Sequence, residues 1–231
     1  MSESKSNWND VIEAGVRLQR LLPDAVLVGG TAAATHASHR ISLDDDHVLT
    51  DLRERFDDVL AHLEESEGWV TARVRRPVLI LGSLDGVETG IRQLIRRLPL
   101  EVEEIETPAG PLRVPTLEEM LRIKAWLVLR RNATRDYLDV VALADRLGVD
   151  AAARVALELD AFYEDQQGEG GERVATQLTK QLAEPAPYDR EDVDLRTYRR
   201  LAKRWHDWHQ VESACRALAH QMLDEIATGG A

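Results

Sequence analysis

The chain has 231 residues, of which 44% are hydrophobic and 30% are charged, and its formal net charge is −12. This length suits one large domain or two small ones, while the apolar runs are too short to span a bilayer. The single cysteine, Cys215, excludes a disulfide scaffold or a cysteine zinc site within one chain. Because the first ten residues are polar rather than signal-like, we expect a cytoplasmic globular protein with no membrane partner.

The first half of the chain mixes helical and strand patterns. Helical spacing predicts a helix over 8–22, and a short buried strand over 25–30 breaks at two glycines, after which Thr31 is expected to cap a short helix. The patterns further downstream predict, in order, a strand over 42–49, an amphipathic helix over 51–67, strands over 69–76 and 77–84, a strand turning into a helix over 86–98, and an edge strand over 100–107 followed by a turn at PAGPL.

From Pro115 onward the pattern is helical. We expect a helix that begins after this proline, a second over 134–148 that Gly148 ends, and further helices over 150–165, 172–183 and 190–227. The sequence therefore predicts a mixed α/β half over residues 1–112 and a helical half over residues 113–231.

A Gly-Gly-Thr turn follows the first predicted strand. Glycines let the backbone approach a ligand closely, and the free amides at a helix start attract anions. The turn over residues 29–31 is therefore a candidate phosphate seat, and the alternative is a turn with no ligand.

Three aspartates lie a short way downstream, at residues 44–46. On a strand, Asp44 and Asp46 project to the same face. Two carboxylates that close repel each other unless a cation lies between them, and Mg²⁺ binds such oxygens while keeping positions open for phosphates. The pair predicts a magnesium site, and the alternative is a solvated acidic loop that caps a helix.

The motif GGTA followed by HRISLDDD resembles the Gly-Gly-Thr/Ser … Arg-x-Ser-x-Asp-x-Asp signature of polymerase-β-type nucleotidyltransferases. More narrowly, it is similar to the AbiEii/MenT-type toxins of bacterial toxin–antitoxin systems. The resemblance implies a set of ligand-binding residues: Gly29, Gly30 and Thr31 at the nucleotide phosphates, Ser42 beside them, and Asp44 and Asp46 at Mg²⁺. Arg40 lies between the turn and the acidic strand, where it could neutralise the carboxylates or contact a triphosphate.

Two positions depart from the family pattern. Asp45 lies between the two metal aspartates, where an apolar residue is usual, and His47 follows directly, where an aromatic or aliphatic residue is common. Many enzymes of this type also use a third carboxylate on a neighbouring strand. The candidate is Glu88, with Glu101 and Glu103 as alternatives, although Glu88 could equally be a surface residue.

Residues 124–143, KAWLVLRRNATRDYLDVVAL, are similar to the family's Lys…Arg…Arg-Asp-x-x-Asp helical motif. Lys124 and Arg131 are seven residues apart on one helix, and Asp136 and Asp139 share a face one helix later. Asp139 has apolar neighbours, so we expect it to be partly buried with a partner. The resemblance makes Lys124 and Arg131 triphosphate ligands, and makes Asp136 or Asp139 the group that orients the lysine or a base. The alternative is an interhelix salt bridge.

The resemblance covers residues 25–148. It implies an α+β fold, with a polymerase-β-like nucleotidyltransferase core of mixed sheet and helices followed by a C-terminal helical bundle. It also implies transfer of a nucleoside monophosphate from a nucleoside triphosphate to an RNA acceptor, such as a tRNA 3′ end, by a toxin that a cognate antitoxin restrains. The alternatives are the same chemistry on a small-molecule or protein hydroxyl, and a catalytically idle nucleotide- or partner-binding protein.

The charge is unevenly distributed along the chain. Residues 71–135 contain twelve Lys/Arg and eight Asp/Glu, a net charge of +4, which leaves −16 on the remainder. Such a segment could contact an RNA backbone through its arginines, or it could form an ordinary solvated face. The clustered arginines are Arg73, Arg75, Arg76, Arg92, Arg96 and Arg97.

Overall fold

The structure is a computed structural model that describes residues 7–96, 98–164 and 171–229. The chain forms two compact units. Unit 1 contains residues up to 35, 41–95 and 99–116, and unit 2 contains residues 36–40, 96–98 and 117–231. The predicted division into separate domains at residue 112 stays a prediction.

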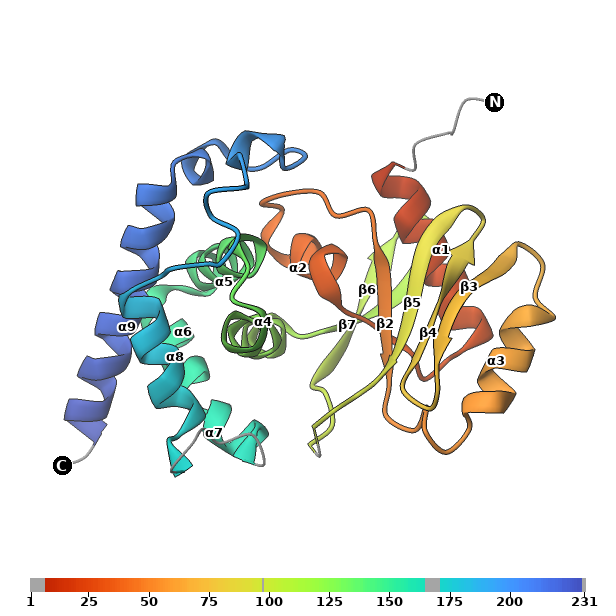
Figure 1. Cartoon of the computed structure of the whole chain (residues 1–231), viewed down its shortest axis with the longest axis horizontal. Coiled ribbons are helices and arrows are strands. Elements are labelled where there is room, and N and C mark those ends of the chain that lie inside the picture. Colours follow the sequence, from red (N-terminus) through yellow and green to blue (C-terminus); the bar gives the residue numbers. More distant parts are fainter. Residues whose placement is uncertain (1–6, 97, 165–170, 230–231) are drawn as a thin grey trace. The chain divides into compact units, whose positions relative to one another are not determined.

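Unit 1 is built on a mixed five-stranded sheet (Figure 1). Its strands are β1 (Val26–Leu27), β2 (Asp45–Leu49), β3 (Trp69–Arg75), β4 (Leu79–Leu84) and β5 (Val87–Gln93). The strand order is β1-β2-β5-β4-β3, in which β2 and β5 pair in parallel and the other neighbours are antiparallel. Strand β3 is therefore an edge strand.

Two helices, α1 (Trp8–Leu21) and α3 (Phe56–Glu64), contribute to the core on one face of this sheet. Asn7 caps α1 through a capping box with Asp10. Alternate residues of the strands point into this core, among them Ile80 on β4 and Ile91 on β5, which face each other in register. A hairpin of β6 (Val102–Thr107) and β7 (Gly110–Pro115) forms a second, two-stranded sheet.

Four sequence predictions in unit 1 need correction. The described residues of the segment 86–98 do not turn helical, because β5 continues to Gln93 with Thr89 and Ile91 buried in the sheet. The predicted turn at PAGPL contains the start of β7, since the hairpin turn spans only residues 108–109. The helix predicted over 51–67 is limited to α3, and the strand predicted from residue 42 begins at Asp45.

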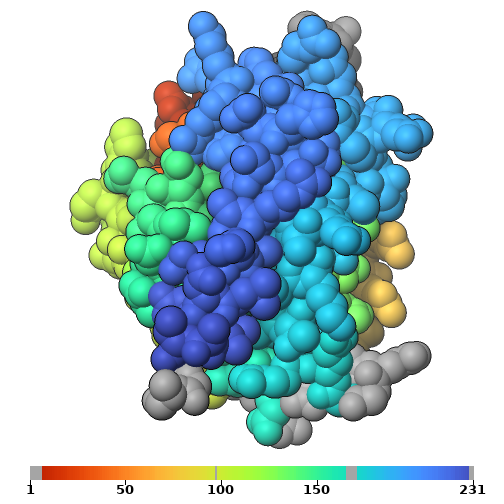
Figure 2. Space-filling model, turned by 90° about the vertical axis from the view of Figure 1, so that its left-hand side faces the viewer, coloured from red at the N-terminus to blue at the C-terminus, as the bar shows by residue number. Residues whose placement is uncertain are grey.

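Unit 2 is helical. Its helices are α4 (Leu117–Arg131), α5 (Thr134–Leu147), α6 (Val149–Leu157), α7 (Leu159–Phe162), α8 (Val174–Ala183) and α9 (Trp208–Gly229). Gly148, with φ of 90°, separates α5 from α6. Figure 2 shows α9 running along one face of this unit, with α8 beside it.

The helix predicted over 190–227 begins only at Trp208, because residues 190–207 form turns and two short 3₁₀ segments, η3 (Leu195–Thr197) and η4 (Lys203–His206). Part of the helix predicted over 150–165 lies outside the described residues. Among the helices that the structure describes, none combines the length and hydrophobicity needed to cross a bilayer.

Candidate active site

The glycine turn and the acidic strand lie side by side in unit 1. Strand β1 pairs antiparallel with β2, and the amide of Val28 donates to the carbonyl oxygen of Asp46 at 2.7 Å. Gly29 then adopts a φ of +76° and begins α2 (Gly29–Ala37). This left-handed conformation favours glycine, so the sharp bend from strand to helix depends on that residue.

Thr31 does not cap α2, because the helix already begins at Gly29. Its side chain is buried, and its hydroxyl donates to the backbone carbonyl oxygen of Asp44 at 2.6 Å. Ser42, also buried, lies two residues before Asp44 in sequence. Thr31 therefore joins the helix start directly to the acidic segment.

The three aspartates alternate in their exposure. Asp44 is exposed, Asp45 is buried and Asp46 is half-buried, as expected where side chains point alternately to opposite faces. A Cβ added to Gly29 would lie 3.3 Å from the Asp46 side chain, and one added to Gly90 would lie 2.7 Å from Asp46 Oδ1. Two glycines thus make the space that the Asp46 carboxylate occupies.

These carboxylates fit the oxygen donors that Mg²⁺ takes, with phosphate and water oxygens completing its shell. Among the described residues, no three Asp, Glu, His or Cys side chains cluster as a ready-made metal site. The cation present near the pair is Arg92, whose Nε lies 3.4 Å from Asp46 Oδ1. Asp44 and Asp46 are therefore candidate metal ligands that would depend on a bound phosphate for further donors.

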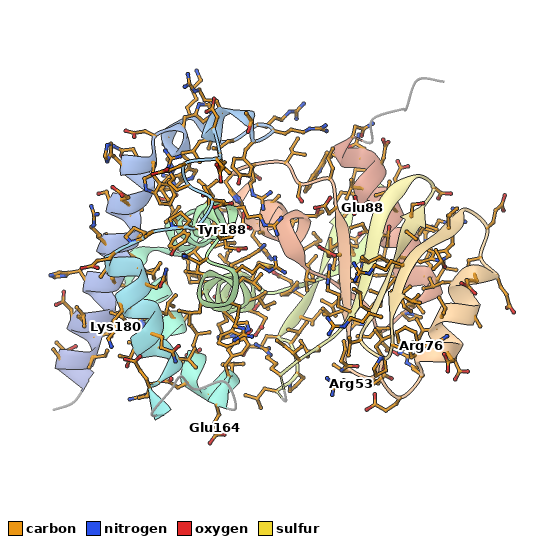
Figure 3. All side chains as sticks on the ribbon, viewed as in Figure 1. Arg53, Arg76, Glu88, Glu164, Lys180 and Tyr188 are labelled. Carbon is orange, nitrogen blue, oxygen red and sulfur yellow. The ribbon has the colours of Figure 1, made fainter. Side chains whose placement is uncertain are left out.

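The candidates for a third carboxylate differ in position. Glu88 lies at the start of β5, the strand that pairs with β2, and is exposed (Figure 3). Since Asp45 pairs with Thr89 in parallel register, Glu88 lies level with Asp44. Glu103 lies instead on β6 of the separate hairpin, and Glu101 directly precedes that strand. Register therefore favours Glu88 over these two alternatives.

Asp45 and His47 point into the core of unit 1, a feature that the sequence did not reveal. Gln19 Nε2 lies 3.3 Å from His47 Nε2 and donates to the carbonyl oxygen of Arg113 at 2.9 Å. Because this nitrogen can only donate, His47 Nε2 accepts and its Nδ1 carries the proton, 3.5 Å from Asp45 Oδ1. The two residues that depart from the family pattern thus face each other.

The pKa values of both members of this pair are shifted towards their neutral forms. Burial, together with the nearby charge of Asp46, raises the pKa of Asp45 well above its usual value, and burial lowers the pKa of His47 to about 3. The Thr89 hydroxyl lies within 3.5 Å of Asp45 Oδ2, to which it can donate, and it also donates to the carbonyl oxygen of Val87 at 3.0 Å. The contact between Asp45 and His47 is therefore polar, and burial favours the uncharged form of both side chains.

The second group of predicted residues lies in unit 2 around Asp139. This carboxylate is fully buried and receives Lys124 Nζ at 2.7 Å, Arg40 Nε at 2.7 Å and His39 Nε2 at 2.8 Å. Burial by itself would raise the pKa of Asp139, but the charges of Arg40 and Lys124 outweigh it and hold that pKa well below its usual value. His39 was not among the predicted site residues, and its only signal was its place before Arg40.

Asp136 and Arg131 differ from this cluster. Asp136 is buried, burial raises its pKa, and its Oδ2 has no hydrogen-bond partner within the described structure. Lys124 is 3% exposed, whereas Arg131 is exposed. The two residues that share a predicted helix face thus have different environments.

The clustered arginines separate into distinct groups. Arg96 is buried in unit 2, where its Nη2 lies 2.7 Å from Glu119 Oε1 and its guanidinium lies 4.8 Å from the Phe162 ring. Arg97 lies outside the described residues. Arg96 therefore does not share a solvent-facing helical surface with Arg92, which lies on β5.

Solved structures share this architecture. An H. pylori protein provisionally assigned as a nucleotidyltransferase aligns with a TM-score of 0.57 and 16% identity over 99% of this chain and 98% of that one. The antibiotic-resistance factor ANT(2'')-Ia aligns with a TM-score of 0.51 and 12% identity over 67% of this chain and 92% of that one. The chain therefore has the polymerase-β-like nucleotidyltransferase fold, a mixed sheet with helices followed by a C-terminal helical region, as predicted.

The relatives found by sequence similarity are named for uptake or export, not for nucleotidyl transfer. The chain is 30% identical over 235 residues to the Heme uptake protein MmpL11 of Mycobacterium tuberculosis and 27% identical over 229 residues to the Mycolic acid-containing lipids exporter MmpL11 of Mycolicibacterium smegmatis. These alignments cover 93% and 97% of this chain but only 23% and 22% of the relatives, so the chain spans about a quarter of their length. No protein-family model matches the chain.

Proposed function

We propose that the protein is a magnesium-dependent nucleotidyltransferase of the EC 2.7.7 type. The observation that carries this proposal is the packing of the Gly29 turn against Asp46, with Thr31 bonded to the backbone of Asp44. The start of α2, which can bind an anion, thereby lies beside the Asp46 carboxylate on β2 and beside the backbone of Asp44, which directly precedes that strand. The fold shared with nucleotidyltransferases supports the same chemistry.

Each residue has a proposed role. Asp44 and Asp46 would hold Mg²⁺, with Glu88 as a third carboxylate, and the metal would polarise the α-phosphate and lower the pKa of the attacking hydroxyl. The amides at the start of α2, near Gly30 and Thr31, would bind phosphate oxygens, with Ser42 beside them. The acceptor oxygen would bond to the α-phosphorus while the bond to pyrophosphate breaks.

The basic residues of unit 2 are proposed to bind the triphosphate. Lys124 donates to Asp139 at 2.7 Å, and this contact supports the proposal that Asp139 orients the lysine. Arg40, which also donates to Asp139, and exposed Arg131 are further proposed phosphate ligands. Asp136 is buried and lies one turn before Asp139 on α5. Its carboxyl group would adjust the net charge around Lys124 and Asp139.

The finer proposal is that the acceptor is RNA, with a tRNA 3′ end as the leading candidate. In this proposal the protein acts as the toxin of an AbiEii/MenT-type system and is restrained by a cognate antitoxin. The motif resemblance supports it, as does the net charge of +4 over residues 71–135.

The test incubates the protein with each α-labelled nucleoside triphosphate, Mg²⁺ and total RNA, with tobramycin as a small-molecule acceptor in a parallel reaction. We expect label in RNA that chelation of Mg²⁺ abolishes and that Asp44→Ala and Asp46→Ala each reduce at least about a hundredfold. Asp58→Ala, which removes an exposed aspartate from α3, is the matched control and should keep full transfer. Label on no acceptor, or equal labelling by Asp46→Ala, would contradict the proposal.

The mycobacterial relatives favour a second candidate function, because the similarity spans nearly the whole chain. We propose, as the alternative, that the chain is equivalent to a segment of a transport protein that binds heme. Titration with hemin, followed in the Soret band, tests it directly. A saturable spectral shift in a protein that binds no nucleotide would favour this candidate over the transferase.

A further inference from the structure

The sheet of unit 1 has one face that carries the carboxylate pair, opposite the core formed with α1 and α3. Cross-strand pairing aligns its side chains in two rows from β2 across β5 and β4 to β3. The residues of these rows, here called the open face, are Asp46, Gly90, Leu81 and Arg73 in one row, and Val48, Arg92, Leu79 and Arg75 in the next. Both rows end in an arginine on the edge strand.

Three observations confirm that these residues share a face. Strand β4 alternates between half-buried and buried residues, so that Leu81 lies opposite the side on which Ile80 enters the core. A Cβ on Gly90 would lie 2.7 Å from Asp46 Oδ1 and 3.1 Å from Leu81 Cδ2. Arg73 pairs with Leu81 after a bulge in β3, so its side chain follows the same face.

The arginines of β3 are available to a ligand. Arg73 and Arg75 are exposed, and neither forms a side-chain hydrogen bond or ion pair within the part of the chain that the structure describes. Arg76, the next arginine, is engaged elsewhere: it forms an ion pair with Asp57 and lies 5.0 Å from the Phe56 ring, on the side of α3 (Figure 3). Arg73 and Arg75 can therefore bind an anion, whereas Arg76 is already paired with Asp57.

The spacing excludes a small acceptor from contacting both ends of a row. Three inter-strand steps separate Asp46 from Arg73, which places their Cα atoms about 14 Å apart. Arg73 and Arg75 are two residues apart along an extended strand, so their Cα atoms lie about 7 Å apart. A ligand that reaches both the carboxylates and these arginines must be long and must carry several negative charges.

We infer that the open face binds the acceptor, and that this acceptor is a single-stranded nucleic acid. Its terminal hydroxyl lies at Asp44 and Asp46, and its upstream phosphates contact Arg73 and Arg75. Half-buried Leu79 and Leu81 lie between and offer apolar surface to unpaired bases, while the arginines supply the positive charge that follows a single-stranded backbone. The inference rests on the proposed nucleotidyl transfer for the placement of the hydroxyl, but the arginine contacts are testable without catalysis.

The experiment measures binding of a fluorescent single-stranded RNA of about ten nucleotides to the full chain without nucleotide, over a range of salt concentrations. We expect Arg73→Gln/Arg75→Gln to weaken binding by roughly tenfold per arginine and to reduce the slope of log K against log salt by about 1.4, or about 0.7 per lost contact. Arg76→Gln removes the same charge on the side of α3 and should bind like the wild type.

Transfer assays separate this inference from the proposed function. In steady-state transfer, Arg73→Gln/Arg75→Gln should raise KM for RNA and leave kcat and Mg²⁺–nucleotide binding unchanged, whereas Asp46→Asn should abolish transfer and keep RNA binding. If wild-type protein transfers label to RNA but the arginine variants bind RNA as well as Arg76→Gln does, the inference is wrong. Label found on protein instead of RNA, with no effect of the arginines, would also overturn it. Arginine-dependent RNA binding without any transfer would refute the proposed chemistry alone.

Discussion

The hydroxyl of Thr31 donates a hydrogen bond of 2.6 Å to the backbone carbonyl oxygen of Asp44. This bond links the first turn of α2 to the segment that carries both candidate metal ligands. It also explains the threonine in the Gly-Gly-Thr turn, because the side chain is buried and acts as a clamp rather than as a helix cap.

Replacing this hydroxyl should misplace the site more than it destabilises the protein. Thr31→Val keeps the shape but removes the donor, so we expect a loss of about 1–2 kcal/mol in unfolding free energy and a larger fractional loss of nucleotidyl transfer. Thr31→Ser keeps the donor and is the control. Comparison of urea unfolding with transfer rates checks both effects, and equal activity of the valine and serine variants would argue against the clamp.

Gly90 should be essential for the position of Asp46. A methyl group at residue 90 would lie 2.7 Å from Asp46 Oδ1 and would rotate that carboxylate away. We expect Gly90→Ala to fold, at a cost of about 1–3 kcal/mol from overpacking, and to lose Mg²⁺-dependent transfer. Gly86→Ala, where an added Cβ meets nothing within 4 Å, carries only the strain of its φ of +81° and should retain transfer.

The raised pKa of Asp45 gives a pH-dependent prediction. Because its pKa is higher in the folded chain, the folded state keeps a proton that the unfolded chain loses, and stability falls as pH rises from the unfolded pKa of about 3.9 towards the folded pKa. Asp45→Asn mimics the protonated acid and removes this loss. We expect the free energy of unfolding of Asp45→Asn, relative to that of the wild type, to increase by up to about 1.4 kcal/mol per pH unit in that window. Unfolding of both proteins at several pH values without Mg²⁺ measures it, with exposed Asp44→Asn as the control.

The stability contribution of Asp139 depends on pH in the opposite direction. Its folded pKa is depressed, so its contribution to stability is present above an unfolded pKa of about 3.9 and is lost as pH falls through the folded value. At pH 7 we expect Asp139→Asn to cost about 3–5 kcal/mol, because Lys124 and Arg40 would keep buried charges without their partner.

A control lies on the same helix. Asp145 is half-exposed and pairs with Arg204. Its replacement by Asn should lower the free energy of unfolding by less than about 1 kcal/mol. Denaturation at pH 7 and at pH 3 compares the two variants, and we expect the difference between Asp139→Asn and wild type to shrink at the lower pH. A difference that is the same at both pH values would contradict the ion-pair account.

The sequence by itself determined the fold class and the local order of the motifs. The apolar patterns at α1, β4 and α5 identified these elements, since periodic burial leaves a direct trace in the sequence. The glycine turn and the aspartates were predicted to act together, and the antiparallel pairing of β1 with β2 explains how they come to lie side by side.

Only the tertiary structure decided what each polar side chain contacts. Arg73, Arg76 and Arg96 are alike in sequence, yet one is exposed on the open face, one pairs beside α3 and one is buried with Glu119. Likewise, Asp45 is buried whereas its neighbour Asp44 is exposed, and burial raises the pKa of Asp45. Charge and hydrogen bonding act across contacts between residues distant in sequence, and the chain order does not record which contacts form.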